Sequence, residues 1–106
     1  MRATRLFASL VSLALTQAAY AAEVTIDQNH MKFVPDKVVL HVGDVLVFQN
    51  SDPMNHNIQV VNDDSDTVDI GLQHPGQIVK QAFTKAGDYE VRCTVHPSML
   101  LSVSVK

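Results

Sequence analysis

From residue 24 onward, apolar and polar side chains alternate in short runs, and a turn signal interrupts them about every ten residues. A period of two is typical of a half-buried β-strand, because successive side chains point to opposite faces. Strand-like runs lie at 24–27, 38–41, 45–50, 58–61, 79–83, 89–93 and 101–105, and the alternation is clearest at 24–27, 89–93 and 101–105. No window in this part of the chain carries a convincing run at helical spacing. The pattern therefore predicts an all-β fold, either a sandwich or a barrel.

The first 21 residues are typical of a secretory signal peptide. Arg2 and Arg5 give a positive start, an apolar run covers 6–15, and Ala19-Tyr20-Ala21 fits a small-x-small cleavage site. A membrane anchor would need about 20 apolar residues, which this run does not supply. We expect residues 1–21 to be removed, although cleavage after Ala22 is nearly as plausible. Residues 22–106 would then form a single domain in the periplasm.

Charge and cysteine content narrow the function classes. The 106-residue chain has a net charge of −3 and no basic stripe, so we expect no nucleic-acid partner. Loss of Arg2 and Arg5 would make the mature chain more acidic, which also disfavours anionic lipid. Cys93 is the single cysteine, so no internal disulfide can form. Small domains commonly need a disulfide or a metal, which makes a bound metal the first alternative.

The segment 62–66, Asn-Asp-Asp-Ser-Asp, is the least structured part of the predicted domain. It favours an exposed loop, and two roles remain open for it. It is a solvated acidic turn, or it docks a basic partner.

One group of residues carries chemistry. Cys93, His96 and Met99 follow one another at three-residue intervals between the last two predicted strands. A tight turn there would gather a thiolate, an imidazole and a thioether around one point. Soft sulfur combined with imidazole suits copper, and a second imidazole would complete the His₂Cys site with a weak axial Met that defines blue copper.

Among the other four histidines, His56 is the best candidate for that second imidazole. It follows a loop, 50–55, between two predicted strands, and so would lie at one end of the sandwich. His30, His41 and His74 are interpreted as surface residues. Taken singly, Cys93 could be a buried small hydrophobe and His-Pro a turn, but the joint spacing in a small secreted β-protein favours the metal.

The chain resembles the cupredoxins, the small type 1 copper proteins, over nearly all of residues 22–106. The matching motifs are Phe33-x-Pro35, Val38-x-Leu40-x-x-Gly43-Asp44, Phe48-x-Asn50, His56-Asn57, and Phe83 with Gly87-x-Tyr89-x-x-x-Cys93. The short Cys-x-x-His-x-x-Met loop is most similar to the amicyanin-like members. Relatives commonly carry x-Gly after the Met, whereas this chain has Leu100-Leu101.

The resemblance implies a Greek-key β-sandwich and an electron carrier, not an enzyme. One type 1 copper would be bound by four ligands: His56, Cys93, His96 and Met99. The chain would be a monomer that passes single electrons between a donor and an acceptor redox protein. Asn50 matches a family position that ties the two ligand loops together and hydrogen-bonds near the cysteine sulfur, and Thr94 lies beside the ligands.

The same reading assigns His56 to the interior and His96 to the solvent edge. An apolar rim would surround His96 and dock redox proteins transiently; its residues are Pro53, Met54, Pro97 and Leu100. Three other functions remain open: copper trafficking or storage outside the cytoplasm, an enzyme with an open metal position, and a metal-free module in which Cys93 forms an intermolecular disulfide.

Overall fold

The computed structural model describes residues 21–106. The predicted signal peptide over 1–21 lies outside these described residues except for Ala21. Within the described part of the chain there is no helix that could span a membrane.

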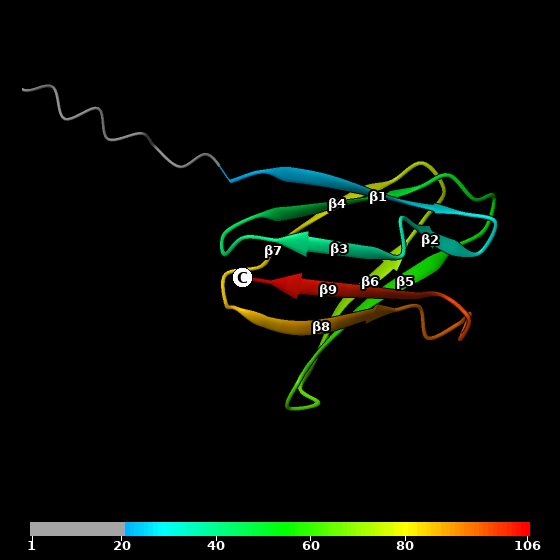
Figure 1. Cartoon of the computed structure of the whole chain (residues 1–106). Helices are drawn as coiled ribbons and strands as arrows, with labels where there is room; N and C mark the ends of the chain where they lie inside the picture. The colour runs from blue at the N-terminus through cyan, green and yellow to red at the C-terminus, as the bar shows by residue number, and fades with distance from the viewer. Residues whose placement is uncertain (1–20) are drawn as a thin grey trace, which may run out of the picture.

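The described residues form nine β-strands (Figure 1), and so the predicted all-β fold is confirmed. They are β1 (Glu23–Asn29), β2 (Lys32–Val34), β3 (Lys37–Leu40), β4 (Val45–Asn50), β5 (His56–Asn62), β6 (Thr67–Gln73), β7 (Ile78–Ala82), β8 (Gly87–Arg92) and β9 (Leu100–Val105).

The strands form two sheets that pack as a sandwich. One sheet has the order β2-β1-β4-β7 and the other has β3-β9-β8-β5-β6. β1 runs parallel to β4 and β3 runs parallel to β9, while the other neighbours are antiparallel. The chain crosses between the sheets repeatedly, which gives the Greek-key sandwich that the resemblance implied.

The core lies between the two sheets and follows from the alternation in the sequence. Ile26 and Phe48 contribute from the four-stranded sheet, and Ile58, Val91 and Leu101 from the other; all five are fully buried. Burying each of these side chains stabilises the fold by about 1.5–3 kcal/mol before entropy is counted. This apolar layer makes the sandwich a rigid support for the loops at its ends.

The predicted turn at Gly43-Asp44 is present between β3 and β4. Gly43 has a φ of 96°, a left-handed conformation that favours glycine. The Asp44 carboxylate accepts backbone N–H bonds from His41 at 2.8 Å and from Ala22 at 3.0 Å. The turn therefore joins the start of β1 to the start of β4.

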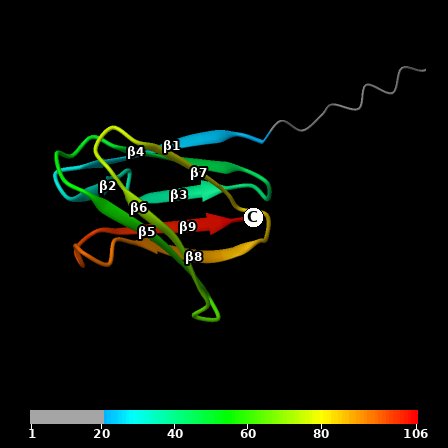
Figure 2. The ribbon, with the colours of Figure 1, turned by 180° about the vertical axis from the view of Figure 1, so that it is seen from behind.

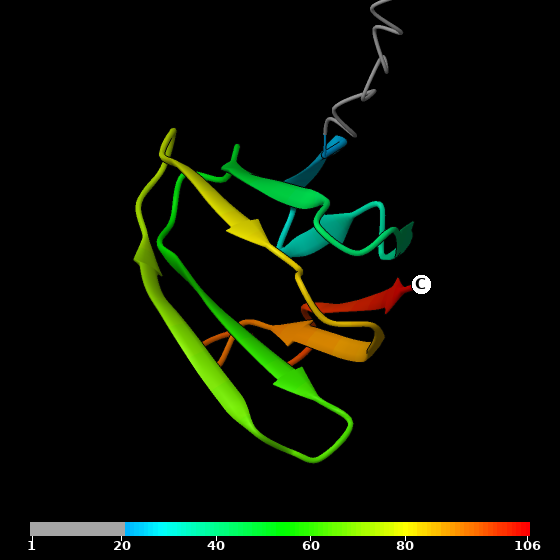
Figure 3. The same ribbon diagram turned by 90° about the vertical axis from the view of Figure 1, so that its left-hand side faces the viewer.

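The strand pattern did not predict β6. β6 pairs with β5 at the edge of the five-stranded sheet, and a bulge interrupts the register between Ile58 and Gln59. Most of its residues are exposed or half-buried, so little apolar alternation marks it. The hairpin of β5 and β6 projects beyond the rest of the sandwich (Figure 3), and its turn contains the acidic segment 62–66, whose residues 63–66 are exposed.

Two connections meet at one end of the sandwich. The loop from β4 to β5 carries the chain from one sheet to the other, and the loop from β8 to β9 turns back within the second sheet. Both lie at the same end in the two opposite views (Figures 1 and 2). This end holds the candidate site.

Candidate metal centre

The pairing of β5 with β8 brings two parts of the site together. Gln59 on β5 lies opposite Arg92 on β8 in an antiparallel register. Because the two strands run in opposite directions, the first residue of β5, His56, reaches the same edge as Cys93, which follows β8. Residues 37 positions apart in the sequence thus become neighbours.

A tight loop after β8 adds the second imidazole. The backbone N–H of Met99 donates to the carbonyl of His96 at 2.9 Å, and the N–H of Cys93 donates to the carbonyl of Met99 at 3.3 Å. These bonds close the loop on itself before β9 begins. The predicted turn between the last two strands is therefore present, and Met99 is fully buried within it.

Three donor atoms converge at this end of the sandwich. Nδ1 of His56 lies 3.1 Å from Nδ1 of His96, and Sγ of Cys93 lies 3.9 Å and 3.7 Å from these two nitrogens. All three atoms lie within 4.8 Å of one another. His56 and Cys93 are buried and His96 is half-buried, as expected from the sequence.

The donor set fits copper. Two nitrogens that face each other at 3.1 Å cannot both carry hydrogen, so at least one presents a lone pair to the space between them. A thiol joins the same space, and its thiolate form is the one that binds metal. Two imidazoles and one thiol that converge in this way match the donor types of the trigonal part of a blue-copper site.

Sequence reasoning missed Asp52, which lies in the loop before β5 and is 5% exposed. Its Oδ2 is 2.7 Å from Nε2 of His56. Burial is the largest single influence on the carboxyl and raises its pKa. The hydrogen bonds that it accepts, with that from the Met31 N–H the largest of them, together hold the pKa of Asp52 below its usual value. Nothing in the sequence marks this loop aspartate as buried. Its position four residues before His56 is the one sequence feature that could have suggested a contact with the imidazole.

The role expected for Asn50 belongs instead to Asn57. Asn50 ends β4, and its side-chain amide donates to the carbonyls of Met54 at 2.9 Å and Gln73 at 3.2 Å. It therefore braces its own loop and the end of β6, and the expectation that it joins the cysteine loop is wrong. The physical reason is its place in the four-stranded sheet, whereas β5 is the strand that neighbours β8.

Asn57 makes the link between the two loops. Its Oδ1 accepts the backbone N–H of Thr94 at 2.7 Å, and its own backbone N–H points to Sγ of Cys93 at 3.5 Å. Thr94 thus lies beside the cluster, with its backbone rather than its side chain in the contact. The sequence shows the His56-Asn57 pair, but it does not show that Asn57 links the two loops.

The remaining histidines lie on the surface, as predicted. His30, His41 and His74 are exposed. His74 pairs through Nδ1 with Oδ1 of Asn55 at 3.0 Å. The residues of the expected apolar rim are also exposed; they are Pro53, Met54, Pro97 and Leu100.

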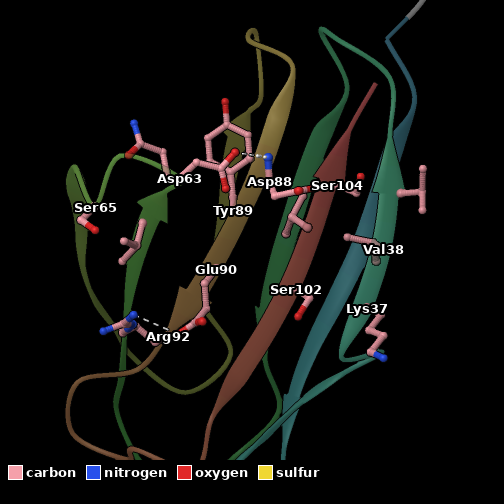
Figure 4. A pocket seen from close by; sticks show the side chains of 14 residues that line it. Lys37, Val38, Asp63, Ser65, Asp88, Tyr89, Glu90, Arg92, Ser102 and Ser104 are labelled. Atoms are coloured by element: carbon pink, nitrogen blue, oxygen red, sulfur yellow. Dashed lines mark hydrogen bonds and ion pairs between the residues drawn. The ribbon is translucent and has the colours of Figure 1, made fainter.

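A hollow of about 710 Å³ lies away from the cluster, on the outer face of the five-stranded sheet (Figure 4). Its lining includes the Glu90–Arg92 ion pair and the contact of Asp63 with the backbone N–H of Asp88. None of the three cluster residues lines it. The converging donors, and not this open hollow, mark the candidate site.

Comparison with known proteins agrees with this geometry. Residues 20–106 match the family described as copper binding proteins, plastocyanin/azurin family. The chain is 30% identical to the methylamine utilization protein MauL of Methylorubrum extorquens over 92% of this chain and 83% of that one. It is 31% identical to amicyanin of Paracoccus denitrificans over 78% of this chain and 65% of that protein.

Solved structures of amicyanin are also similar to this chain. An oxidised proline-to-alanine mutant aligns with a TM-score of 0.73 and 28% identity, covering 80% of this chain and 83% of that chain. A reduced tryptophan-to-tyrosine mutant aligns with a TM-score of 0.72 and 28% identity, covering 85% and 87%. The sandwich and the sequence motifs therefore point to the same group of proteins.

Proposed function

Because this chain belongs to the plastocyanin/azurin family of copper-binding proteins, we propose that it is a periplasmic blue copper protein that carries single electrons between redox proteins. One type 1 copper would be held by the cluster residues His56, Cys93 and His96 together with Met99. The observation that carries the proposal is the convergence of two imidazole nitrogens and one thiol within 4.8 Å at one end of a rigid sandwich.

Copper bound here supplies a one-electron couple between Cu(II) and Cu(I). The chain's contribution is to hold the donors still. His56 begins a strand, Cys93 follows one, and both side chains are buried. Donors fixed in this way move little when the charge of the metal changes, which favours fast electron transfer. Cys93 binds as the thiolate, and its proton is released when the metal enters.

Electrons enter and leave beside His96, which is the half-buried member of the cluster. The surrounding rim of Pro53, Met54, Pro97 and Leu100 offers exposed apolar contacts. Such a patch suits brief docking, because electron-transfer contacts are small and weak. The chain works as a monomer, and its donor and acceptor dock here in turn.

The test uses the chain from Ala22 with one equivalent of Cu(II). We expect an intense blue absorption band and narrow copper hyperfine splitting in the electron paramagnetic resonance spectrum. Cys93→Ala removes the thiolate and should abolish the blue band, while the surface control His74→Ala should keep it. A colourless parent, or a blue Cys93→Ala variant, would contradict the proposal.

A second measurement separates electron transfer from copper delivery. The reduced, copper-loaded protein is mixed with a Cu(I) chelator, and release of the metal is followed over time. An electron carrier retains its copper through many oxidation cycles. Rapid transfer of the metal to the chelator would instead favour trafficking or storage.

A further inference from the structure

Asp52 connects the candidate metal centre to a turn that belongs to the opposite sheet. Its carboxylate accepts three hydrogen bonds: Oδ2 from Nε2 of His56 at 2.7 Å, Oδ2 from the N–H of Met31 at 2.9 Å, and Oδ1 from the N–H of His30 at 2.7 Å. Asp52 is only 5% exposed, so its carboxylate is buried and is held by these three hydrogen bonds.

The two backbone donors come from the turn between β1 and β2. His30 and Met31 have φ values of 54° and 56°, both in the left-handed region that non-glycine residues seldom adopt. The β1–β2 turn and the loop from β4 to β5 lie side by side in the two opposite views (Figures 1 and 2). Asp52 therefore fixes the turn and the imidazole at once, and each contact limits how far the carboxylate can move.

The contact with Asp52 determines which nitrogen of His56 carries hydrogen. A carboxylate accepts hydrogen bonds, so Nε2 is the protonated nitrogen of a neutral His56 ring. Nδ1 is then the bare nitrogen, and it is the atom that faces His96 and Cys93. The contact with Asp52 thus sets the ring in the tautomer and orientation that a metal requires.

On the basis of the proposed function, we propose that Asp52 is a positioning residue that holds His56 ready for copper and lowers the reduction potential of the bound metal. A carboxylate that accepts from a ligand imidazole makes that ligand more basic. Its negative charge also favours the more highly charged metal ion, and burial weakens the screening of that charge by water. Both effects favour Cu(II) over Cu(I).

Asp44 provides a matched control within the same chain. It is another buried aspartate, and its carboxylate also accepts two backbone N–H bonds that hold a turn. It precedes β4, whereas Asp52 follows β4, so the length of that strand separates it from the cluster. Replacing Asp44 by Asn disturbs a turn and removes a charge without touching a ligand.

The redox test compares Asp52→Asn, Asp52→Glu and Asp44→Asn, each loaded with copper. The equilibrium with a one-electron reference couple is measured by the blue absorption. We expect Asp52→Asn to shift this equilibrium about tenfold toward Cu(I), equivalent to a potential about 59 mV higher. In Asp52→Glu the equilibrium constant should stay within about threefold of the parent value, because a carboxylate still accepts from His56. In Asp44→Asn it should also stay within about threefold, because the Asp52 carboxylate is unchanged.

Three results would overturn the role of the charge. One is an Asp52→Asn shift no larger than that of Asp44→Asn, which would limit Asp52 to holding the turn. The second is an equal shift in Asp52→Asn and Asp52→Glu, which would assign the effect to geometry. The third is a shift toward Cu(II) in Asp52→Asn.

A measurement on the metal-free protein tests the positioning without any copper. Nitrogen-15 NMR of the parent should show His56 protonated at Nε2, with a proton that exchanges slowly, and Asp52→Ala should speed that exchange at least about tenfold because its acceptor is lost. An Nδ1-protonated ring in the parent would overturn the proposal. If the parent fails to turn blue, the proposed function fails, while this experiment still decides the role of Asp52 toward His56.

Discussion

Oδ1 of Asn57 accepts the backbone N–H of Thr94 at 2.7 Å, and this contact joins the strand that begins with His56 to the loop that begins with Cys93. The two residues are 37 positions apart in the sequence. Each directly follows a member of the cluster, so this bond helps to fix the distance between His56 and Cys93.

Asn57→Ala should therefore loosen the site. Loss of the bond should lower the free energy of unfolding by about 1 kcal/mol, because the Thr94 N–H loses its partner. Copper affinity should fall by roughly 10–100-fold, as for other groups that orient ligands. Denaturant unfolding and competition with a copper chelator measure the two effects. Asn55→Ala, which removes an exposed contact with His74, is the control, and equal losses in both variants would refute the link.

The proposed apolar rim is tested by placing a charge on one of its residues. Leu100→Asp should slow electron self-exchange between oxidised and reduced copies at least about tenfold, because like charges would meet in the contact. The blue band should remain unchanged. Val39→Asp places the same charge on β3, at a residue that is 63% exposed, and should leave the rate near that of the parent. An unchanged rate in Leu100→Asp would show that docking occurs elsewhere.

Acid should destabilise the metal-free protein partly through Asp44. The bond from His41 is the largest influence on this carboxyl and, with the bond from Ala22, lowers the pKa of Asp44 in spite of its desolvation. Since the folded pKa is depressed, the stabilisation is complete above the unfolded value of about 3.9 and is lost as the pH falls through the folded pKa. Urea unfolding across this range should show a shallower pH dependence in Asp44→Asn than in the parent. Identical slopes would contradict this assignment.

The position at which the predicted signal peptide is cleaved should also affect stability. The Ala22 N–H donates to Asp44 at 3.0 Å, and its carbonyl accepts from the Val45 N–H at 2.9 Å. Cleavage after Ala21 would keep both bonds and place a new ammonium group beside the carboxylate, which strengthens the first. We expect the exported protein to have the mass of a chain that begins at Ala22. A chain that begins at Glu23 should be about 1 kcal/mol less stable, and equal thermal midpoints would contradict this expectation.

Removing copper should lower the stability of the whole domain. A ligand that binds only the folded state adds about 2.7 kcal/mol when its free concentration is 100 times its dissociation constant. Chelation should therefore lower the thermal midpoint of the parent. Cys93→Ala should show almost no difference between copper-loaded and chelated samples. A similar difference in that variant would mean that copper stabilises the chain from another position.

Local sequence patterns predicted the parts of this protein that depend on neighbouring residues. Alternation marked β9, which buries one face against the core, and the apolar run 45–48 marked β4, which is buried over Leu46, Val47 and Phe48. The Cys-x-x-His-x-x-Met spacing marked a loop that gathers donors. β6 escaped prediction because an edge strand buries little, and its one fully buried residue, Gln73, is polar.

The two supporting residues of the site required the three-dimensional arrangement. In the sequence Asp52 is an ordinary loop aspartate. In the folded chain the β1–β2 turn donates two backbone N–H bonds to it. Asn50 precedes the loop that leads to His56, and Asn57 follows His56. Only the order of the strands shows that Asn57 is the one that lies next to β8. Partners separated by 20 to 40 residues leave no periodic trace in a sequence.

The pairing of β5 with β8 also determines when, during folding, the donors of the cluster come together. His56 emerges from synthesis well before Cys93, and the two meet only when strands from distant parts of the chain have registered. Long-range pairing of this kind is slow to form, because the entropy lost on closing the intervening chain has to be offset first. The three donors of the cluster are therefore brought together only once β5 and β8 have paired.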